Sequence, residues 1–275
     1  MKIPIIFIHL NDVRVLHKTI PQAIKHNNDV FVIGDAPVEN YCRDHGVNFS
    51  NYEDFCSSAF HEFDSNYIHM SSNTPWIEKF CFLRWFILDE YVRQKELETI
   101  FYCDSDVMIY CDVTEEWEKY NQFDATLVHR SCGATSYFTK TGINNFCNYT
   151  QEIYKNTSSY KFDDLLFKYK NHQKNNVDGG VCDMTLLDRF HYDDAHLGGP
   201  ARIGEMTHVI DDSVFDHNIN VDEGIYDYDE AIGIKNIQFD NGIPFCYHKN
   251  LKRKVKFNSL HFQGKAKNIL YEYNS

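Results

Sequence analysis

Two carboxylates separated by one residue, Asp104 and Asp106, follow the apolar segment TIFYC at residues 99–103. Carboxylate oxygens at this spacing can share one divalent cation, directly or through water. A second such pair, Asp227 and Asp229, shows how easily an acidic chain forms the pattern. The first pair stands where an apolar strand is expected to reach the surface, whereas the second lies in the polar segment EGIYDYDEAIG. We therefore predict that the first pair binds a metal ion and that the second does not.

The C-terminal segment HFQGKAK places further ligand types close together. His261 is expected at the end of a strand, and Gly264 lets the backbone approach a ligand. Two cationic side chains, Lys265 and Lys267, follow directly. An imidazole and two carboxylates suit Mn²⁺ and leave coordination positions for phosphate oxygens. The segment is therefore predicted to bind a metal ion and a diphosphate.

A β-α-β pattern at the N-terminus predicts the sheet that positions the acidic pair. Apolar, partly β-branched runs predict buried parallel strands at residues 3–10, 31–34 and 99–103. Residues 13–27 have helical spacing, although Pro21 is expected to kink or divide that helix. Residues 74–94 predict a long, mostly buried helix. Because open α/β sheets bind ligands outside the carboxyl ends of their strands, the acidic pair should lie at a ligand site.

The rest of the chain continues the α/β pattern without an internal repeat or a low-complexity linker. Two more strands are predicted at 123–129 and 136–141, and a last one at 255–262. Three helices are predicted at 143–155, 162–172 and 183–192, before a stretch rich in Gly, Asp and His at 191–247. We predict one α/β domain over residues 1–275. The expected nucleotide-binding half is 1–110, and the acceptor-side half with the metal- and diphosphate-binding tail is 111–275.

The composition excludes several classes of protein. With 43% hydrophobic residues in 275, the chain can bury a sizeable core. The 27 Lys and Arg residues against 40 Asp and Glu residues give a net charge of −13, which disfavours binding to nucleic acid or anionic lipid. The first ten residues are too short a hydrophobic run for a secretory signal, and no later run is long enough for a transmembrane segment. Nine scattered cysteines without a CxxC pair favour neither a disulfide framework nor a zinc site, so we expect a cytoplasmic protein.

Three segments together resemble a known family. IFYCDSDVMIY and HFQGKAK look like the two signatures of GT-A glycosyltransferases, particularly those of glycosyltransferase family 8 and the glycogenin type. KFCFLRWFILDEY resembles that family's helix whose arginine reaches the donor. The resemblance extends over residues 1 to about 267 but leaves 191–247 unmatched. It implies a single Rossmann-like GT-A domain with a mixed, mostly parallel central sheet.

The resemblance also implies roles for individual residues. Asp104, Asp106 and His261 would bind the cation. Arg84 would contact the nucleotide or the sugar of the donor, although a helical arginine is also often a surface or ion-pair residue. The remaining donor-binding candidates are placed at strand ends or in the signatures: Asn11, Asp12, Asp35, Ser105, Gly264, Lys265 and Lys267. The first three of these could instead be turn and cap residues.

Two acidic residues are candidates for catalysis. NNVDGGVCDMTLL resembles the family's loop-to-helix segment below the donor sugar. Asp183 would open the helix, where it could cap the N-terminus, bind sugar hydroxyls or act as a base on the acceptor. Asp178 is the competing candidate. The basic stretch at 249–256 is interpreted as a surface strand, with added positive potential near the diphosphate as the alternative.

These observations predict a glycosyltransferase that uses Mn²⁺ or Mg²⁺ to neutralise a leaving nucleoside diphosphate. By resemblance the donor is a UDP-sugar, the transferred group a hexose or pentose, and the acceptor a glycan or glycolipid. The family 8 likeness suggests retention of configuration, whereas an acceptor base would give inversion. One alternative is a metal-dependent nucleotidyltransferase, although FIHLND lacks the glycines of a phosphate loop. A non-catalytic carbohydrate-binding domain is the other.

Overall fold

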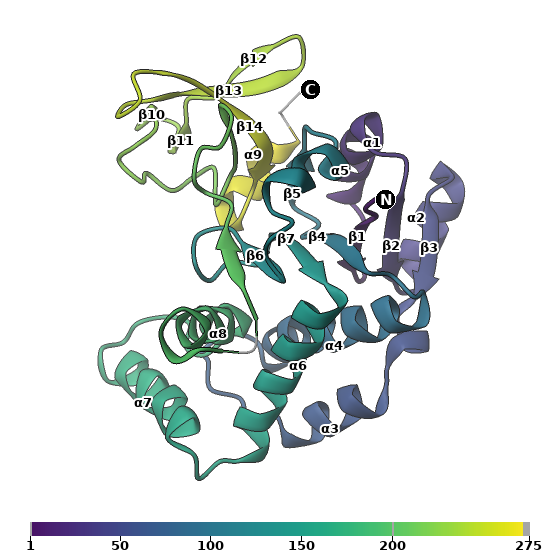
Figure 1. Cartoon of the computed structure of the whole chain (residues 1–275), viewed down its shortest axis with the longest axis vertical. Coiled ribbons are helices and arrows are strands. Elements are labelled where there is room, and N and C mark those ends of the chain that lie inside the picture. Colours follow the sequence, from purple (N-terminus) through teal and green to yellow (C-terminus); the bar gives the residue numbers. More distant parts are fainter. Residues whose placement is uncertain (1, 200, 272–275) are drawn as a thin grey trace.

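A seven-stranded sheet forms the centre of the molecule (Figure 1). The computed structural model describes residues 2–199 and 201–271. Within them, the strand order is β3-β2-β1-β4-β7-β6-β8. All strands of this sheet run in one direction except β7, which is antiparallel to both of its neighbours. The predicted mixed, mostly parallel α/β sheet is confirmed. Its strands are β1 (Ile5–His9), β2 (Val30–Gly34), β3 (Asn48–Asn51), β4 (Thr99–Cys103), β6 (Ala125–Leu127), β7 (Thr135–Thr139) and β8 (Ile203–Glu205).

Helices cover both faces of this sheet, which explains why its central strands β2, β1 and β4 are mostly apolar. Successive side chains of β1 point to opposite faces, so Ile6 and Ile8 pack in one core and Ile5 and Phe7 in the other. The first core also contains α3, α4, α6 and α8, and the second contains α1 and α2. The helices are α1 (Leu16–His26), α2 (Ala36–His45), α3 (Ser58–Asn66), α4 (Pro75–Gln94), α5 (Val113–Glu116), α6 (Lys140–Lys155), α7 (Tyr160–Lys174), α8 (Asp183–Leu197) and α9 (Lys267–Leu270).

A second sheet joins the C-terminal half to the end of β4. Its order is β12-β13-β14-β5, and β9 also pairs with β14, between Lys256 and Ser259. The pairing of β14 with β5 is antiparallel and sets His261 opposite Val107. The strands are β5 (Val107–Ile109), β9 (Ser213–Phe215), β12 (Gln238–Asp240), β13 (Ile243–His248) and β14 (Arg253–His261), with a separate hairpin of β10 (Tyr228–Asp229) and β11 (Ile234–Lys235).

Most predicted elements are present, with some differences at their boundaries. The helix α1 runs through Pro21 without division, because this proline is exposed and the carbonyl group that loses its partner can be hydrated. The polar edge strand β3, Asn48–Asn51, had no apolar signal and was not predicted. The basic stretch 249–256 forms an exposed turn and the first residues of β14. Along that strand Arg253 lies about 26 Å and Lys256 about 17 Å from His261, which supports the surface interpretation.

The composition raised two questions, whether the cysteines pair and whether any helix could cross a membrane. All nine cysteines are free. Within residues 2–199 and 201–271, no helix has the length and apolar character that crossing a membrane requires.

Candidate active site

Asp104, Asp106 and His261 meet at the carboxyl edge of the central sheet. Asp104 directly follows β4, and Asp106 directly precedes β5. The pairing of β5 with β14 then carries His261 to the same point from the far end of the chain. One ligand atom from each of the three side chains lies within 4.8 Å of the other two. Two carboxylates and an imidazole so close together fit a divalent cation such as Mn²⁺.

The ring of His261 is fixed in an orientation that suits a metal ligand. Its Nδ1 lies 2.6 Å from the backbone oxygen of His217, which can only accept, so Nδ1 carries the proton. The other nitrogen, Nε2, lies 3.6 Å from Oδ1 of Asp106 and keeps its lone pair toward the carboxylates. A metal-binding histidine commonly has its second nitrogen held in this way.

Behind His261 lies a buried ion pair that sequence reasoning did not find. The backbone N–H of His261 donates to Oδ2 of Asp216 at 3.0 Å, and Nζ of Lys235 donates to Oδ1 of the same carboxylate at 2.7 Å. The side chain of Lys235 is 1% exposed, and that of Asp216 is fully buried. Both residues lie in the 191–247 stretch that matched no motif. This stretch therefore holds the backbone of His261 in place.

Asp106 is held between two cationic or cation-forming groups. His261 lies on one side, and Nζ of Lys267 lies 3.1 Å from Oδ2 of Asp106 on the other. Burial alone would raise the pKa of Asp106, but its interactions with His261 and Lys267 outweigh burial and lower that pKa. Burial likewise opposes protonation of His261, but Asp106 raises the pKa of the ring overall. The carboxylate of Asp106 is therefore kept ionised, as a metal ligand must be.

Arg84, on α4, connects Asp104 to α8. Its guanidinium donates to Asp104 at 2.6 Å, to Asp183 at 2.7 Å and to the hydroxyl of Tyr102 at 3.0 Å. Burial disfavours the charged guanidinium, but the neighbouring Asp104, Tyr102 and Asp183 raise the pKa of Arg84. Arg84 thus is an ion-pair residue inside the site, where one group orients two carboxylates.

We expect Arg84→Met to lower the free energy of unfolding by about 3 kcal/mol, because it leaves two largely buried carboxylates without their shared cation. Chemical denaturation measures this change. Arg43→Met on α2 is the control, since the side chains of Arg43 and Asp44 are 66% and 68% exposed and their ion pair should contribute at most about 1 kcal/mol. Equal losses in the two variants would show that Arg84 has no special structural role.

Asp183 is the first residue of α8, and its carboxylate is already occupied. Oδ2 accepts from Arg84 and, at 3.0 Å, from Nε1 of Trp85, while Oδ1 accepts from the backbone N–H of Met184. The N-cap of α8 is Cys182, so the interpretation of Asp183 as the capping residue is wrong. Cys182 and Thr185 form a capping box there instead. A carboxylate with these donors is suited to positioning other groups.

The site residues line a cleft of about 350 Å³. Besides His261, the charged side chains of its wall comprise four carboxylates (Glu78, Asp104, Asp106 and Asp183) and two cations (Arg84 and Lys267). Their net charge of −2 matches one divalent cation. Ser105 lines the same cleft, and its hydroxyl lies 2.9 Å from Nδ1 of His9, the last residue of β1. The other ring nitrogen of His9, Nε2, donates to the backbone oxygen of Asp12 and so carries the proton. Nδ1 therefore accepts, and the Ser105 hydroxyl donates to it.

The other predicted site residues lie outside this cleft wall. Asp178 is exposed and borders a separate cavity at the end of α7. Asn11 donates its backbone N–H to both oxygens of Asp35, at 3.2 and 3.0 Å, which ties the end of β1 to that of β2. Asp12 pairs with Arg14 at the surface. Because β2, β1 and β4 are parallel neighbours, Asn11, Asp12 and Asp35 lie at the same edge of the sheet as Asp104.

The tail after β14 turns at Gly264, which has a φ of +59° that glycine adopts most readily. This turn begins the short 3₁₀ helix Gly264–Ala266, and Lys265 on it is exposed. The turn directs Lys267 back to Asp106. The turn at Gly264 therefore explains how a tail lysine reaches the acidic pair.

Gly180 allows the loop before α8 to pack against the backbone of Met70 and Ser71. A Cβ atom there would lie 2.3 Å from the backbone oxygen of Met70, and the residue has a φ of +149°. Gly180 forms a β-bridge with Ser71, and the N–H of Val181 donates to Met70. This close contact fixes where α8 begins, and with it the position of Asp183.

Comparison with known proteins bears on the fold. No protein-family model and no curated protein matches the sequence. Among solved structures, the apo structure of the bifunctional glycosyltransferase WbbM aligns with 96% of this chain at 11% identity and a TM-score of 0.50. The chain has a GT-A glycosyltransferase fold. Mouse xyloside xylosyltransferase 1 aligns with 77% of this chain and 86% of its own, at 9% identity and a TM-score of 0.48.

This chain spans less than half the length of two of the chains whose structures it resembles. The match covers 46% of the WbbM chain, and 45% of the chain of the glycosyltransferase GlyE from Streptococcus pneumoniae. The GlyE match spans 74% of this chain at 15% identity and a TM-score of 0.43. At such identities the likeness concerns the fold, and the activity must be argued from the site.

Proposed function

We propose that this protein is a metal-dependent glycosyltransferase that moves a sugar from a UDP-sugar to a glycan or glycolipid acceptor. The observation that carries the proposal is the cluster of Asp104, Asp106 and His261 at the carboxyl edge of a GT-A sheet. Paired acidic ligands at this edge of the sheet lie where open α/β folds bind nucleotides. The nucleotidyltransferase and non-catalytic alternatives have no comparable supporting observation.

We infer that the three ligand side chains hold Mn²⁺ or Mg²⁺, which would supply positive charge to a leaving diphosphate. Lys267, half exposed and adjacent to Asp106, can turn from that carboxylate to the phosphates, with Gly264 and Lys265 beside it. Such a cation stabilises the negative charge that develops as the sugar bond breaks. Arg84 and Asp183 line the same cleft, where Arg84 joins Asp183 to Asp104, and they would orient the donor sugar.

The remaining assignments follow the two halves of the chain. We propose that 1–110 holds the nucleotide, with Asn11, Asp12 and Asp35 near the base and ribose and Ser105 near the diphosphate. Residues 111–275 would then carry the acceptor side and the tail. Asp183 is the stronger candidate for a catalytic contact because it lines the cleft, whereas Asp178 does not. We also propose a cytoplasmic location, which would keep the nine free cysteines reduced.

Thermal denaturation with UDP and Mn²⁺ tests the nucleotide assignment. A ligand that binds only the folded state raises the melting temperature by mass action. A panel of nucleotide-sugars with Mn²⁺ then identifies the donor by its slow hydrolysis, in which release of UDP distinguishes sugar transfer from the nucleotidyl transfer of the alternative. A protein that UDP and Mn²⁺ leave unshifted, and that hydrolyses no donor, would contradict the proposal. The configuration of the product, read by NMR, separates retention from inversion and so tests the likeness to family 8.

We expect His261→Ala and Lys267→Ala to have different effects on turnover. The first removes a neutral nitrogen ligand while two carboxylates remain, so it should raise the Mn²⁺ concentration needed for half-maximal rate by about 10- to 100-fold. The second should lower the rate at saturating Mn²⁺ by about 100-fold, because it removes a charge that faces the leaving group. Rates measured against Mn²⁺ concentration separate the two. Identical profiles for both variants would refute the division of roles.

A further inference from the structure

A large cavity lies between α7 and α8, beside the cleft that is proposed to bind the donor. It has a volume of about 620 Å³ and extends along α8 from Cys182 to Leu197, about 22 Å of helix. Cys182 and Met184 line both this cavity and the cleft that holds Asp183. The two cavities therefore adjoin at the N-terminus of α8, where the donor sugar is proposed to lie.

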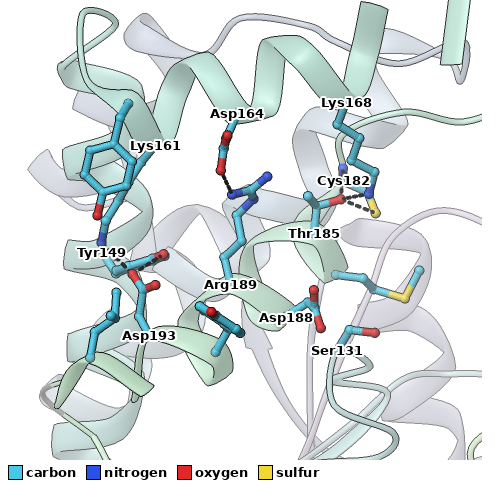
Figure 2. A pocket seen from close by; sticks show the side chains of 14 residues that line it. Ser131, Tyr149, Lys161, Asp164, Lys168, Cys182, Thr185, Asp188, Arg189 and Asp193 are labelled. Carbon is cyan, nitrogen blue, oxygen red and sulfur yellow. Dashed lines mark hydrogen bonds and ion pairs between the residues drawn. The ribbon is translucent and has the colours of Figure 1, made fainter. Parts of the chain in front are cut away.

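The charged side chains of this cavity balance one another. Three cations and three carboxylates line it, although the chain as a whole has a net charge of −13. Arg189 pairs with Asp164 across the two helices at 2.8 Å (Figure 2). Figure 2 shows Tyr149, Lys161 and Asp193 gathered at one end of the cavity. The remaining cation and carboxylate are Lys168 and Asp188. A neutral lining that mixes donors with acceptors fits a neutral ligand with both kinds of group.

Several polar groups in the cavity are still free to bind. Nε of Arg189 is buried and has no hydrogen-bond partner among the described residues. Asp188 is exposed and makes no hydrogen bond or ion pair in the described part of the chain. The hydroxyl of Tyr149 and Nζ of Lys161 both donate to Asp193, at 2.8 and 2.6 Å, so that end is preorganised.

Exposed aromatic rings complete the lining. The side chains of Tyr160 and Tyr192 are 68% and 50% exposed, although both are large hydrophobic groups. A tyrosine ring offers an apolar face beside a polar hydroxyl. Sugars have the complementary surface, with C–H groups on a ring face and hydroxyls, which donate and accept, at the edges.

We propose that this cavity binds a neutral oligosaccharide and presents its end to the donor cleft as the acceptor. The proposal rests on the proposed function, since the cavity is an acceptor site only if the adjoining cleft binds a sugar donor. The balanced charges disfavour phosphorylated or polyanionic acceptors. The exposed tyrosines and the unpartnered Asp188 favour a saccharide over a peptide.

A printed oligosaccharide array, followed by titration calorimetry with the array's tightest binder, tests the proposal. We expect the wild type to bind neutral oligosaccharides. Tyr192→Ala should weaken this binding about fivefold, and Asp188→Ala about tenfold. Tyr247→Ala is the matched control, because Tyr247 is 44% exposed on β13 and belongs to none of the described cavities that adjoin the donor cleft. All three variants should keep the wild-type thermal shift with UDP and Mn²⁺.

The outcomes separate this proposal from the function on which it rests. Three outcomes, each with a normal thermal shift on addition of UDP and Mn²⁺, overturn the acceptor site alone. They are no oligosaccharide binding, binding only of acidic glycans, and an equal loss of oligosaccharide affinity in Tyr192→Ala and Tyr247→Ala. Binding of an unmodified peptide in this cavity, in place of the oligosaccharides, also overturns it. A wild type that fails to respond to UDP and Mn²⁺ overturns the proposed function, and the acceptor role with it, whatever the array shows.

Discussion

Asp104→Asn or Asp106→Asn is expected to reduce metal-dependent sugar transfer by at least about 100-fold. Each substitution replaces a charged oxygen ligand with a neutral amide. Loss of a residue that only orients a metal ligand typically lowers metal affinity or activity by about 10- to 100-fold, so loss of a ligand itself should lower them more. Removal of the metal with EDTA should have the same effect on the wild type, and added Mn²⁺ should reverse it. Donor hydrolysis and the thermal shift with UDP measure both effects.

Two controls make this result specific. Asp227→Asn changes the rival acidic pair, in which Asp227 contacts Asn236 and Asp229 accepts from the backbone of the following turn. It should leave the UDP shift unchanged. Because Asp106 is only 6% exposed, the variants must be compared at equal folded fraction, checked by circular dichroism. Full activity after EDTA treatment, together with silent substitutions at both positions, would falsify the metal assignment.

Lys235→Met is expected to lower the free energy of unfolding by about 3–5 kcal/mol. It leaves the carboxylate of Asp216 buried without its cation, and an unpaired buried charge is among the most costly single changes. Lys155→Met is the control, since Lys155 and Glu62 form an exposed pair that should contribute at most about 1 kcal/mol. Urea denaturation measures both losses.

A double variant separates stability from the positioning of His261. Lys235→Met with Asp216→Leu removes both charges, so much of the lost stability should return. In the double variant the backbone N–H of His261 loses its acceptor, so its Mn²⁺ requirement should be raised above that of the wild type and of Lys235→Met. If the double variant had the Mn²⁺ requirement of the wild type, Asp216 would have a structural role only.

Local sequence predicted three strands and two helices of residues 1–110, but it missed α2, β3 and α3. Continuous apolar runs predicted β1, β2 and β4, since strands buried on both faces have no polar alternation. The start of α4 followed from Pro75, because proline is favoured in the first turn of a helix. The edge strand β3 was missed because NFSN is polar and only partly buried. Its pairing with β2 depends on backbone hydrogen bonds, which carry no residue pattern.

The sequence by itself determined the chemical types at the site, because a close acidic pair and a tail of His, Gly and Lys can be read from residue spacing. Only the tertiary structure decided which of these groups meet. The register of β14 on β5 brings His261 to Asp106, and long-range register depends on the packing of whole sheets. The buried partners Asp216 and Lys235, and the cavity between α7 and α8, arise in the same way, from segments that have no local signal of a shared site.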